Sequence, residues 1–155
     1  MITLKSPREI DLMRRAGQAV ALVLHEMCEM VTPGVSTGEL DKYAESRCKE
    51  LGVQPAFKGY HGFPACVCIS VNDEVVHGIP SMKRILQEGD IVGMDFGVIR
   101  DGWYGDSART VAVGKVSREA ADLMSRTAEA LRLGIEQARA GNRIFDIGHA
   151  VQNYV

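Results

Sequence analysis

The sequence predicts an α/β (α+β) fold, because segments of helical periodicity flank a central block of β-branched segments. Capped helical patterns occupy residues 6–31 and 36–51, strand patterns occupy residues 65–113, and helical patterns return after Ser117. The chain has 155 residues, 46% of them hydrophobic, which is enough to bury one core. We therefore expect one domain in which helices precede and follow a sheet.

Two helices open the chain. Residues 6–9 (SPRE) have the pattern of a capping box with proline at the first helical position, and apolar residues then recur at helical spacing as far as Val31. A second start signal at residues 36–39 (STGE) predicts a helix that Gly52 closes. Both predicted helices carry an apolar face.

The central block begins with a predicted hairpin. Residues 65–71 are rich in β-branched residues and cysteine, Asn72 and Asp73 suit a turn, and residues 74–79 are expected to return as the partner strand. Cys66 and Cys68 would point to one face of the first strand, either as buried thiols or as part of a pocket wall. None of the four cysteines has the spacing of a zinc or redox site.

A second predicted hairpin contains two carboxylates in unusual places. The pair Asp101-Gly102 is a strong turn signal between strands at residues 91–99 and 103–113. Asp95 lies in the middle of the first strand, where strand propensity disfavours aspartate, and Asp106 lies in the second. A buried carboxylate needs a partner, so both residues are candidates for a functional site.

The two-residue turn predicts that Asp95 and Asp106 are neighbours. Asp106 then faces Gly97, and Asp95 lies two positions along on the same face. Like charges this close repel unless a cation lies between them, so the pair predicts one or two divalent metals, with Gly97 and Gly105 leaving room. In the alternative reading Asp95 bonds to backbone and Asp106 caps a strand. A three-residue loop would put them on opposite faces.

Two further features are open to a structural or a functional interpretation. His77 lies among valines on the predicted returning strand, where a histidine can be an edge or core residue or a functional group. Residues 57–64 (FKGYHGFP) form an aromatic loop rich in glycine, which is either a packed surface loop or the wall of an apolar pocket.

The helical regions share a pattern that predicts an internal duplication. The sequence DLMRR at residues 11–15 recurs as DLMSR at residues 122–126, and each is followed by a glycine turn, an acidic residue and an apolar residue. On this interpretation residues 1–116 form a first repeat. Residues 117–155 would be the helices of a truncated second repeat, whose strands would follow Val155.

Composition argues against several classes of partner. The net charge of −2 gives no electrostatic footprint for nucleic acid or anionic lipid. The longest apolar run, residues 19–24, is too short to span a bilayer, and residues 1–9 have no apolar core of a secretion signal. We expect a cytoplasmic protein without a nucleic-acid or membrane partner.

Four motifs and the aspartate pair follow one another in a characteristic order. They are residues 59–64 (GYHGFP), 68–72 (CISVN), 76–80 (VHGIP) and 89–92 (GDIV), and then Asp95 and Asp106. In this order they resemble type I methionine aminopeptidases, and the resemblance runs from about Ser6 to the last residue. These enzymes are metal-dependent hydrolases that remove the initiator methionine from nascent proteins.

The resemblance implies a fold and a cofactor. The fold is the pita-bread (creatinase/aminopeptidase-like) fold, an internally duplicated α/β catalytic domain. The 155 residues would form an incomplete domain with its first half and the starting helices of the second. The intact enzyme would use two divalent ions of cobalt, manganese, iron or zinc and act on the N-terminal methionine of peptides and nascent proteins.

The resemblance also implies roles for individual residues. Asp95 and Asp106 match metal ligands, and Asp106 matches the carboxylate that bridges both ions. His77 matches a catalytic histidine that contacts the substrate, and Phe57 stands where close bacterial relatives often have cysteine. The pocket for the methionine side chain is matched by Tyr60, Phe63 and Cys68.

The family completes its site with two histidines and two glutamates from the second half, which would follow Val155. We therefore expect metal to bind this chain partially or not at all, and the chain alone to be inactive. Its expected partners are the missing C-terminal half or a second copy of the chain. The alternatives are a non-catalytic pita-bread module that binds macromolecules and a self-associating half-fold.

Overall fold

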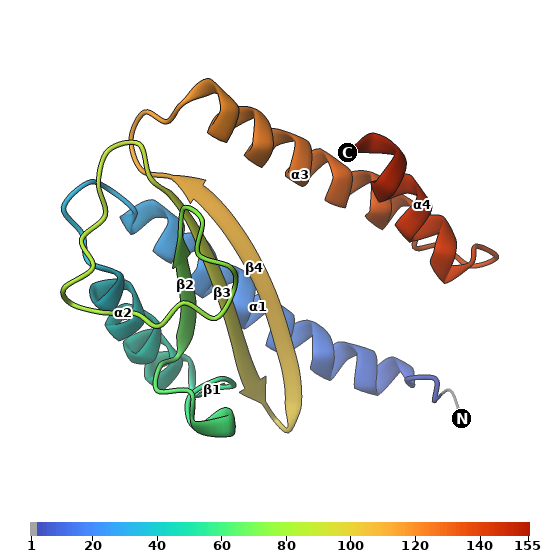
Figure 1. Cartoon of the computed structure of the whole chain (residues 1–155). Coiled ribbons are helices and arrows are strands. Elements are labelled where there is room, and N and C mark those ends of the chain that lie inside the picture. Colours follow the sequence, from blue (N-terminus) through green and yellow to red (C-terminus); the bar gives the residue numbers. More distant parts are fainter. Residues whose placement is uncertain (1–2) are drawn as a thin grey trace. The chain divides into compact units, whose positions relative to one another are not determined.

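The computed structural model describes residues 3–155 and contains two compact units, which divide between Lys115 and Val116 (Figure 1). In the first unit two long helices precede an antiparallel sheet. The elements of this unit are α1 (Pro7–Met30), α2 (Thr37–Leu51), β1 (Gln54–Pro55), the short 3-10 helix η1 (Tyr60–Gly62), β2 (Val67–Val71), β3 (Ile91–Arg100) and β4 (Trp103–Ala112).

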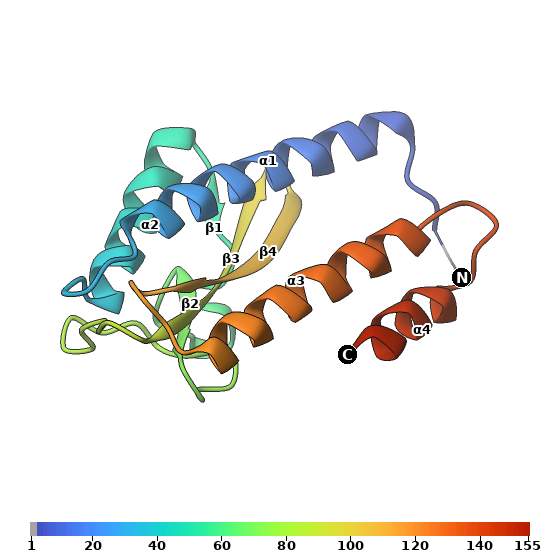
Figure 2. The ribbon, with the colours of Figure 1, turned by 90° about the horizontal axis from the view of Figure 1, so that it is seen from above.

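Strand β3 is the centre of the sheet. It pairs along its whole length with β4, and its other edge pairs first with β2 and, further along, with β1. The two helices cover one face of this sheet (Figures 1 and 2). Alternate residues of β3 are completely buried against the helices, namely Val92, Met94, Phe96 and Val98. The intervening residues of β3 therefore face away from the helices.

Capping boxes start both helices, as the sequence predicted. At α2 the Ser36 hydroxyl accepts a hydrogen bond from the Glu39 backbone N–H at 3.2 Å, and Glu39 Oε2 accepts from the Ser36 backbone N–H at 2.8 Å. The Ser36 hydroxyl also donates to Glu39 Oε2 at 2.7 Å. These hydrogen bonds to Ser36 lower the pKa of Glu39 below its ordinary value of 4.5.

This lowered pKa predicts a pH-dependent contribution to stability. Because the folded pKa of Glu39 is depressed, its charge stabilises the fold fully above pH 4.5, and that contribution disappears as the pH falls through the folded value. Glu39→Gln keeps an acceptor but loses the charge. We expect the variant to be less stable than the wild type at pH 7. The difference in their unfolding free energies, measured with urea, should become smaller toward pH 3. A difference in unfolding free energy that stays constant from pH 7 to pH 3 would contradict a stabilising charge on Glu39.

The predicted strand at residues 74–79 is wrong. These residues are irregular after the turn at Asn72, and the left-handed backbone of His77, with φ of 67°, is incompatible with a strand. The segment makes two backbone hydrogen bonds to β2: the Ile69 N–H donates to the Gly78 carbonyl at 2.9 Å, and the Glu74 N–H donates to the Val71 carbonyl at 3.2 Å. Valine favours a strand when its side chain packs on a sheet, but Val75 is 86% exposed.

The second unit consists of two helices, α3 (Arg118–Gln137) and α4 (Ile144–Tyr154), that pack on each other. Gly134 allows this contact, because a Cβ there would lie 3.0 Å from a methyl group of Val151. The helices agree with the predicted helical segments, whereas the internal duplication remains a prediction. Among residues 3–155 we find no helix with the length and apolarity needed to cross a bilayer. Large apolar side chains of this unit are exposed at Leu123, Leu131, Ile135, Ile144 and Phe145.

Candidate metal and substrate site

The β3–β4 hairpin brings the two aspartates together as the turn composition predicted. Gly97 is paired with Asp106, and Asp95 is paired with Ala108. Asp95 and Asp106 are therefore diagonal neighbours on the sheet face that α1 and α2 leave uncovered. The alternative in which a three-residue loop separates them is excluded by this register.

The charge of one aspartate affects the other. Burial is the largest cause that raises the pKa of Asp95 above its ordinary value of 3.8. The negative charge of Asp106 and a hydrogen bond with its carboxyl group raise this pKa further, whereas nearby His77 lowers it. The negative charge of Asp106 therefore acts on Asp95, and a divalent cation between two such carboxylates would relieve this repulsion.

The residue types fit part of a metal site. Two carboxylates on adjacent rigid strands supply the hard oxygen ligands that divalent first-row metals accept. Within residues 3–155, however, no third His, Cys, Asp or Glu joins Asp95 and Asp106 to make a metal-binding group. The described residues therefore bring together two candidate ligands, fewer than the four or more ligands that such ions take in proteins.

The two glycines beside the aspartates have close neighbours elsewhere in the chain. A Cβ at Gly97 would lie 2.8 Å from the Phe57 ring, so this glycine makes room for an aromatic side chain. A Cβ at Gly105 would lie 2.6 Å from the backbone of Ala16, so this glycine lets α1 approach the opposite face of the sheet. The prediction that Gly105 leaves room for metal is wrong, because a Cβ there would point toward α1, whereas the same prediction for Gly97 stays a prediction.

A cavity of about 550 Å³ lies over the aspartate pair. It combines a carboxylate end with an aromatic wall, and it contains all six residues that the sequence proposed for the site. The lining residues are Phe57, Tyr60, His61, Gly62, Phe63, Pro64, Cys68, His77, Ile79, Asp95 and Asp106. The 57–64 loop is therefore a cavity wall as well as a surface loop, since Tyr60 remains 67% exposed.

The two neighbouring cysteines have different environments. Cys68 is paired with Asp95 and lines the cavity, whereas Cys66 precedes β2 and belongs to the hydrophobic core. The expectation that both point to one face of a strand is wrong, because the strand begins at Val67. Burial first, and then the charges of Asp95 and Asp106, raise the pKa of Cys68 to about 11, so its thiol is protonated at neutral pH.

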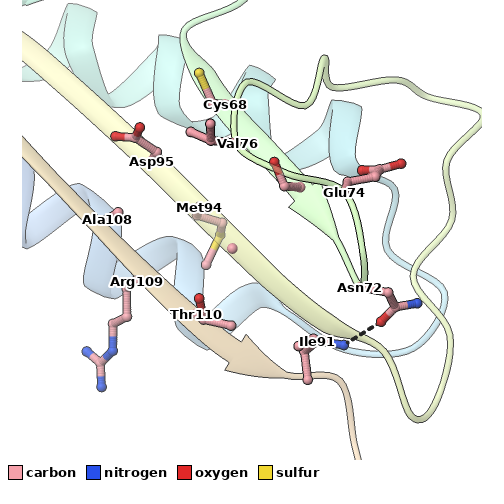
Figure 3. Close-up of a pocket in the computed structure, with 12 residues that line it drawn as sticks. Cys68, Asn72, Glu74, Val76, Ile91, Met94, Asp95, Ala108, Arg109 and Thr110 are labelled. Atoms are coloured by element: carbon pink, nitrogen blue, oxygen red, sulfur yellow. Dashed lines mark hydrogen bonds between the residues drawn. The ribbon is translucent and has the colours of Figure 1, made fainter. Parts of the chain in front are cut away.

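A second hollow of about 260 Å³ continues along the same sheet face (Figure 3). Cys68 and Asp95 line both cavities, and Thr110 marks the β4 side of the hollow. Arg109, the neighbouring residue on β4, also lines the hollow. The uncovered face of the sheet is thus hollowed along much of β3.

Sequence reasoning did not identify the contact that anchors the start of β2. Asp41 Oδ1 on α2 accepts hydrogen bonds from the backbone N–H groups of Cys66 at 2.7 Å and Val67 at 3.1 Å. Lys58 of the cavity loop pairs with Glu45, one turn further along α2, at 3.0 Å. An acidic residue within a helix gives no local signal of such a role, because its partners are distant in the sequence.

Comparison with known proteins identifies the family. A model of metallopeptidase family M24 matches residues 11–155. The chain belongs to this family. Across its whole length it is 48% identical to a methionine aminopeptidase of Clostridium acetobutylicum. It also superimposes on the crystal structure of methionine aminopeptidase from Thermotoga maritima with a TM-score of 0.96 and 40% identity, over 100% of the chain.

The M24 assignment confirms the α/β fold class and the pita-bread fold, and these likenesses confirm the resemblance to methionine aminopeptidases. The chain spans 62% of the length of the Clostridium relative and 62% of the Thermotoga chain. Prolidase from Pyrococcus furiosus shares the fold with a TM-score of 0.84 at 21% identity, over 97% of this chain and 43% of that one. As an M24 metallopeptidase the chain belongs to a family that uses divalent metal.

Proposed function

We propose that this chain forms the N-terminal part of a methionine aminopeptidase, with Asp95 and Asp106 as metal ligands. One observation carries this proposal: both carboxylates, His77 and the aromatic loop line a single cavity. Hard ligands at one end and an apolar wall at the other suit a substrate with a charged amino terminus and an apolar side chain. The relatives named methionine aminopeptidase support the choice of methionine as that side chain.

Each group has a role in this proposal. Tyr60, Phe63 and Cys68 hold the methionine side chain, and the protonated Cys68 thiol adds no charge to that pocket. His77 lies at the same cavity and contacts the substrate near the scissile amide, where its imidazole donates or accepts a hydrogen bond. This arrangement fixes the substrate before reaction and lowers the entropic part of the barrier.

Asp95 and Asp106 would be the residues of this chain that hold the two divalent ions, which would be cobalt, manganese, iron or zinc. When bound, such ions lower the pKa of a shared water toward about 7 and polarise the scissile carbonyl. The two carboxylates fix this chemistry at one end of the cavity and neutralise part of the positive charge. Because new proteins arise at the ribosome, the proposal includes action in the cytoplasm.

A chimera tests this function. We would join residues 1–155 to the portion of the Clostridium acetobutylicum methionine aminopeptidase that they do not match, and call the product the complete enzyme. With manganese, it is expected to release methionine from Met-Ala-Ser but not leucine from Leu-Ala-Ser. A folded complete enzyme that releases no methionine, in an assay where the intact Clostridium protein does, would refute the proposal.

We also propose that the 155-residue chain alone is inactive, because two carboxylates hold metal weakly. The C-terminal portion of the parent enzyme is the partner that this proposal requires. Two alternatives are self-association and a non-catalytic binding role. Among the described residues, β4 pairs with β3 along one edge, and α3 and α4 carry exposed apolar residues. An unpaired strand edge and exposed apolar residues suit either alternative. Methionine release by the purified chain that disappears in Asp95→Ala would overturn the inactivity.

A further inference from the structure

Next to His77, the loop of residues 74–79 is hydrogen-bonded to β2 through Gly78. The Gly78 backbone N–H donates a hydrogen bond to Ser70 Oγ at 3.2 Å, and the Gly78 carbonyl accepts one from the Ile69 N–H at 2.9 Å. Ser70 lies on the same face of β2 as Cys68, and both line the smaller hollow together with Asp95. The residue that follows His77 is therefore bonded directly to the strand that lines the cavity.

The fit at this point is close. A Cβ at Gly78 would lie 2.1 Å from the Ile69 carbonyl oxygen and 3.0 Å from the Ser70 Cα, so only glycine fits without movement of the backbone. The loop therefore rests directly on the β2 backbone at Ile69 and Ser70.

The rest of the loop provides little apolar packing that could hold His77. Its neighbours Val76 and Ile79 are 54% and 62% exposed. His77 itself has the left-handed φ of 67°, a conformation that a non-glycine residue adopts only when its surroundings enforce it. Gly78, the next residue, makes two hydrogen bonds to β2 that hold the backbone at this place.

We propose that Ser70 is a positioning residue for His77. By accepting the Gly78 N–H, its hydroxyl holds the His77 backbone in the left-handed conformation and keeps the imidazole at the cavity beside Asp95. The inference rests on the proposed function, in which His77 contacts the substrate, and adds the residue that keeps it in place. Ser70 acts through Gly78 and has no direct role in the chemistry.

Three variants test this in the complete enzyme. Ser70→Ala removes the acceptor, and we expect kcat for Met-Ala-Ser to fall about 10- to 100-fold with KM changed less than about threefold, since a small displacement of a reacting group has effects of this size. Ser70→Thr keeps a hydroxyl and should restore kcat to within about threefold. Ser46→Ala serves as the matched control, since Ser46 is an exposed serine whose hydroxyl donates a hydrogen bond to Glu50, and this variant should leave kcat unchanged.

A double-mutant cycle separates positioning from a general structural effect. In a His77→Ala background, Ser70→Ala should lower kcat no further, because the residue that it positions is absent. The inference is overturned if Ser70→Ala costs as much in that background as in the wild type, if Ser70→Thr fails to rescue, or if Ser70→Ala leaves kcat unchanged.

Hydrogen exchange in the 155-residue chain provides a readout that needs no activity. The Gly78 amide should be protected in the wild type and exchange at least tenfold faster in Ser70→Ala, while β3 amides keep their protection. Equal Gly78 exchange in both proteins would overturn the inference even if the complete enzyme were inactive. An inactive wild-type complete enzyme with the expected exchange pattern would instead refute only the proposed function.

Discussion

Asp106→Asn in the complete enzyme is expected to lower kcat/KM for Met-Ala-Ser by about 10³-fold or more. The substitution preserves the shape of the side chain but removes the negative charge that would help to hold the metal ions at the proposed site. Metal ions contribute several kcal/mol of transition-state stabilisation, and each 1.36 kcal/mol corresponds to a factor of ten in rate. The measurement is the initial rate of methionine release as a function of substrate concentration at saturating manganese.

The matched control is Asp101→Asn in the turn of the same hairpin. Asp101 is exposed and left-handed, with φ of 52°, a conformation that asparagine adopts readily. This variant should keep kcat/KM within about twofold of the wild type. That result would show that the lower kcat/KM of Asp106→Asn is specific to position 106 and is not a general effect of replacing an aspartate in the hairpin. An Asp106→Asn enzyme that keeps more than a tenth of the activity would argue against a metal-binding carboxylate.

The second large effect concerns stability. Gly105→Ala should destabilise the 155-residue chain by about 3 kcal/mol, the upper part of the range for overpacked sites. The added Cβ would meet the Ala16 carbonyl carbon and oxygen at 2.6 Å, and these are backbone atoms of α1 that cannot rotate away. Either α1 or β4 must move, and both contribute to the main core. Urea unfolding monitored by circular dichroism gives the difference in unfolding free energy.

Gly17→Ala is the control, since it makes the same change on the helix that Gly105 contacts. No atom lies within 4 Å of a Cβ at Gly17, and alanine favours a helix by about 1 kcal/mol over glycine. This variant should therefore be more stable than the wild type. If both variants shifted stability in the same direction, close packing of α1 on β4 would not be the reason for glycine at position 105.

Elements governed by local signals could be predicted from the sequence. Capping boxes involve residues three apart, so the starts of α1 and α2 are readable in the chain itself. The Asp101-Gly102 turn fixes the β3–β4 register, and this register places Asp95 and Asp106 on one face. The geometry of the candidate metal site thus depends on a turn of two residues, which is why it was predictable.

Features that depend on distant contacts could not be predicted. The valines after β2 favour a strand, but the close contact between Gly78 and Ile69 and the exposure of Val75 give a loop instead. The role of Gly105 depends on Ala16, far away in the sequence. Asp41 likewise reaches backbone groups at the start of β2 from a separate helix. No periodicity or motif in a single sequence records such pairs.

Manganese titration of the 155-residue chain, followed by paramagnetic broadening of its amide NMR signals, tests the central claim most directly. The account predicts weak binding with broadening centred on residues 95 and 106, strongly reduced in Asp95→Asn and in Asp106→Asn but preserved in Asp101→Asn. Broadening centred on another acidic group, such as Glu26 and Glu50 around Arg47, or broadening that persists in the Asp95→Asn, Asp106→Asn double variant, would contradict it.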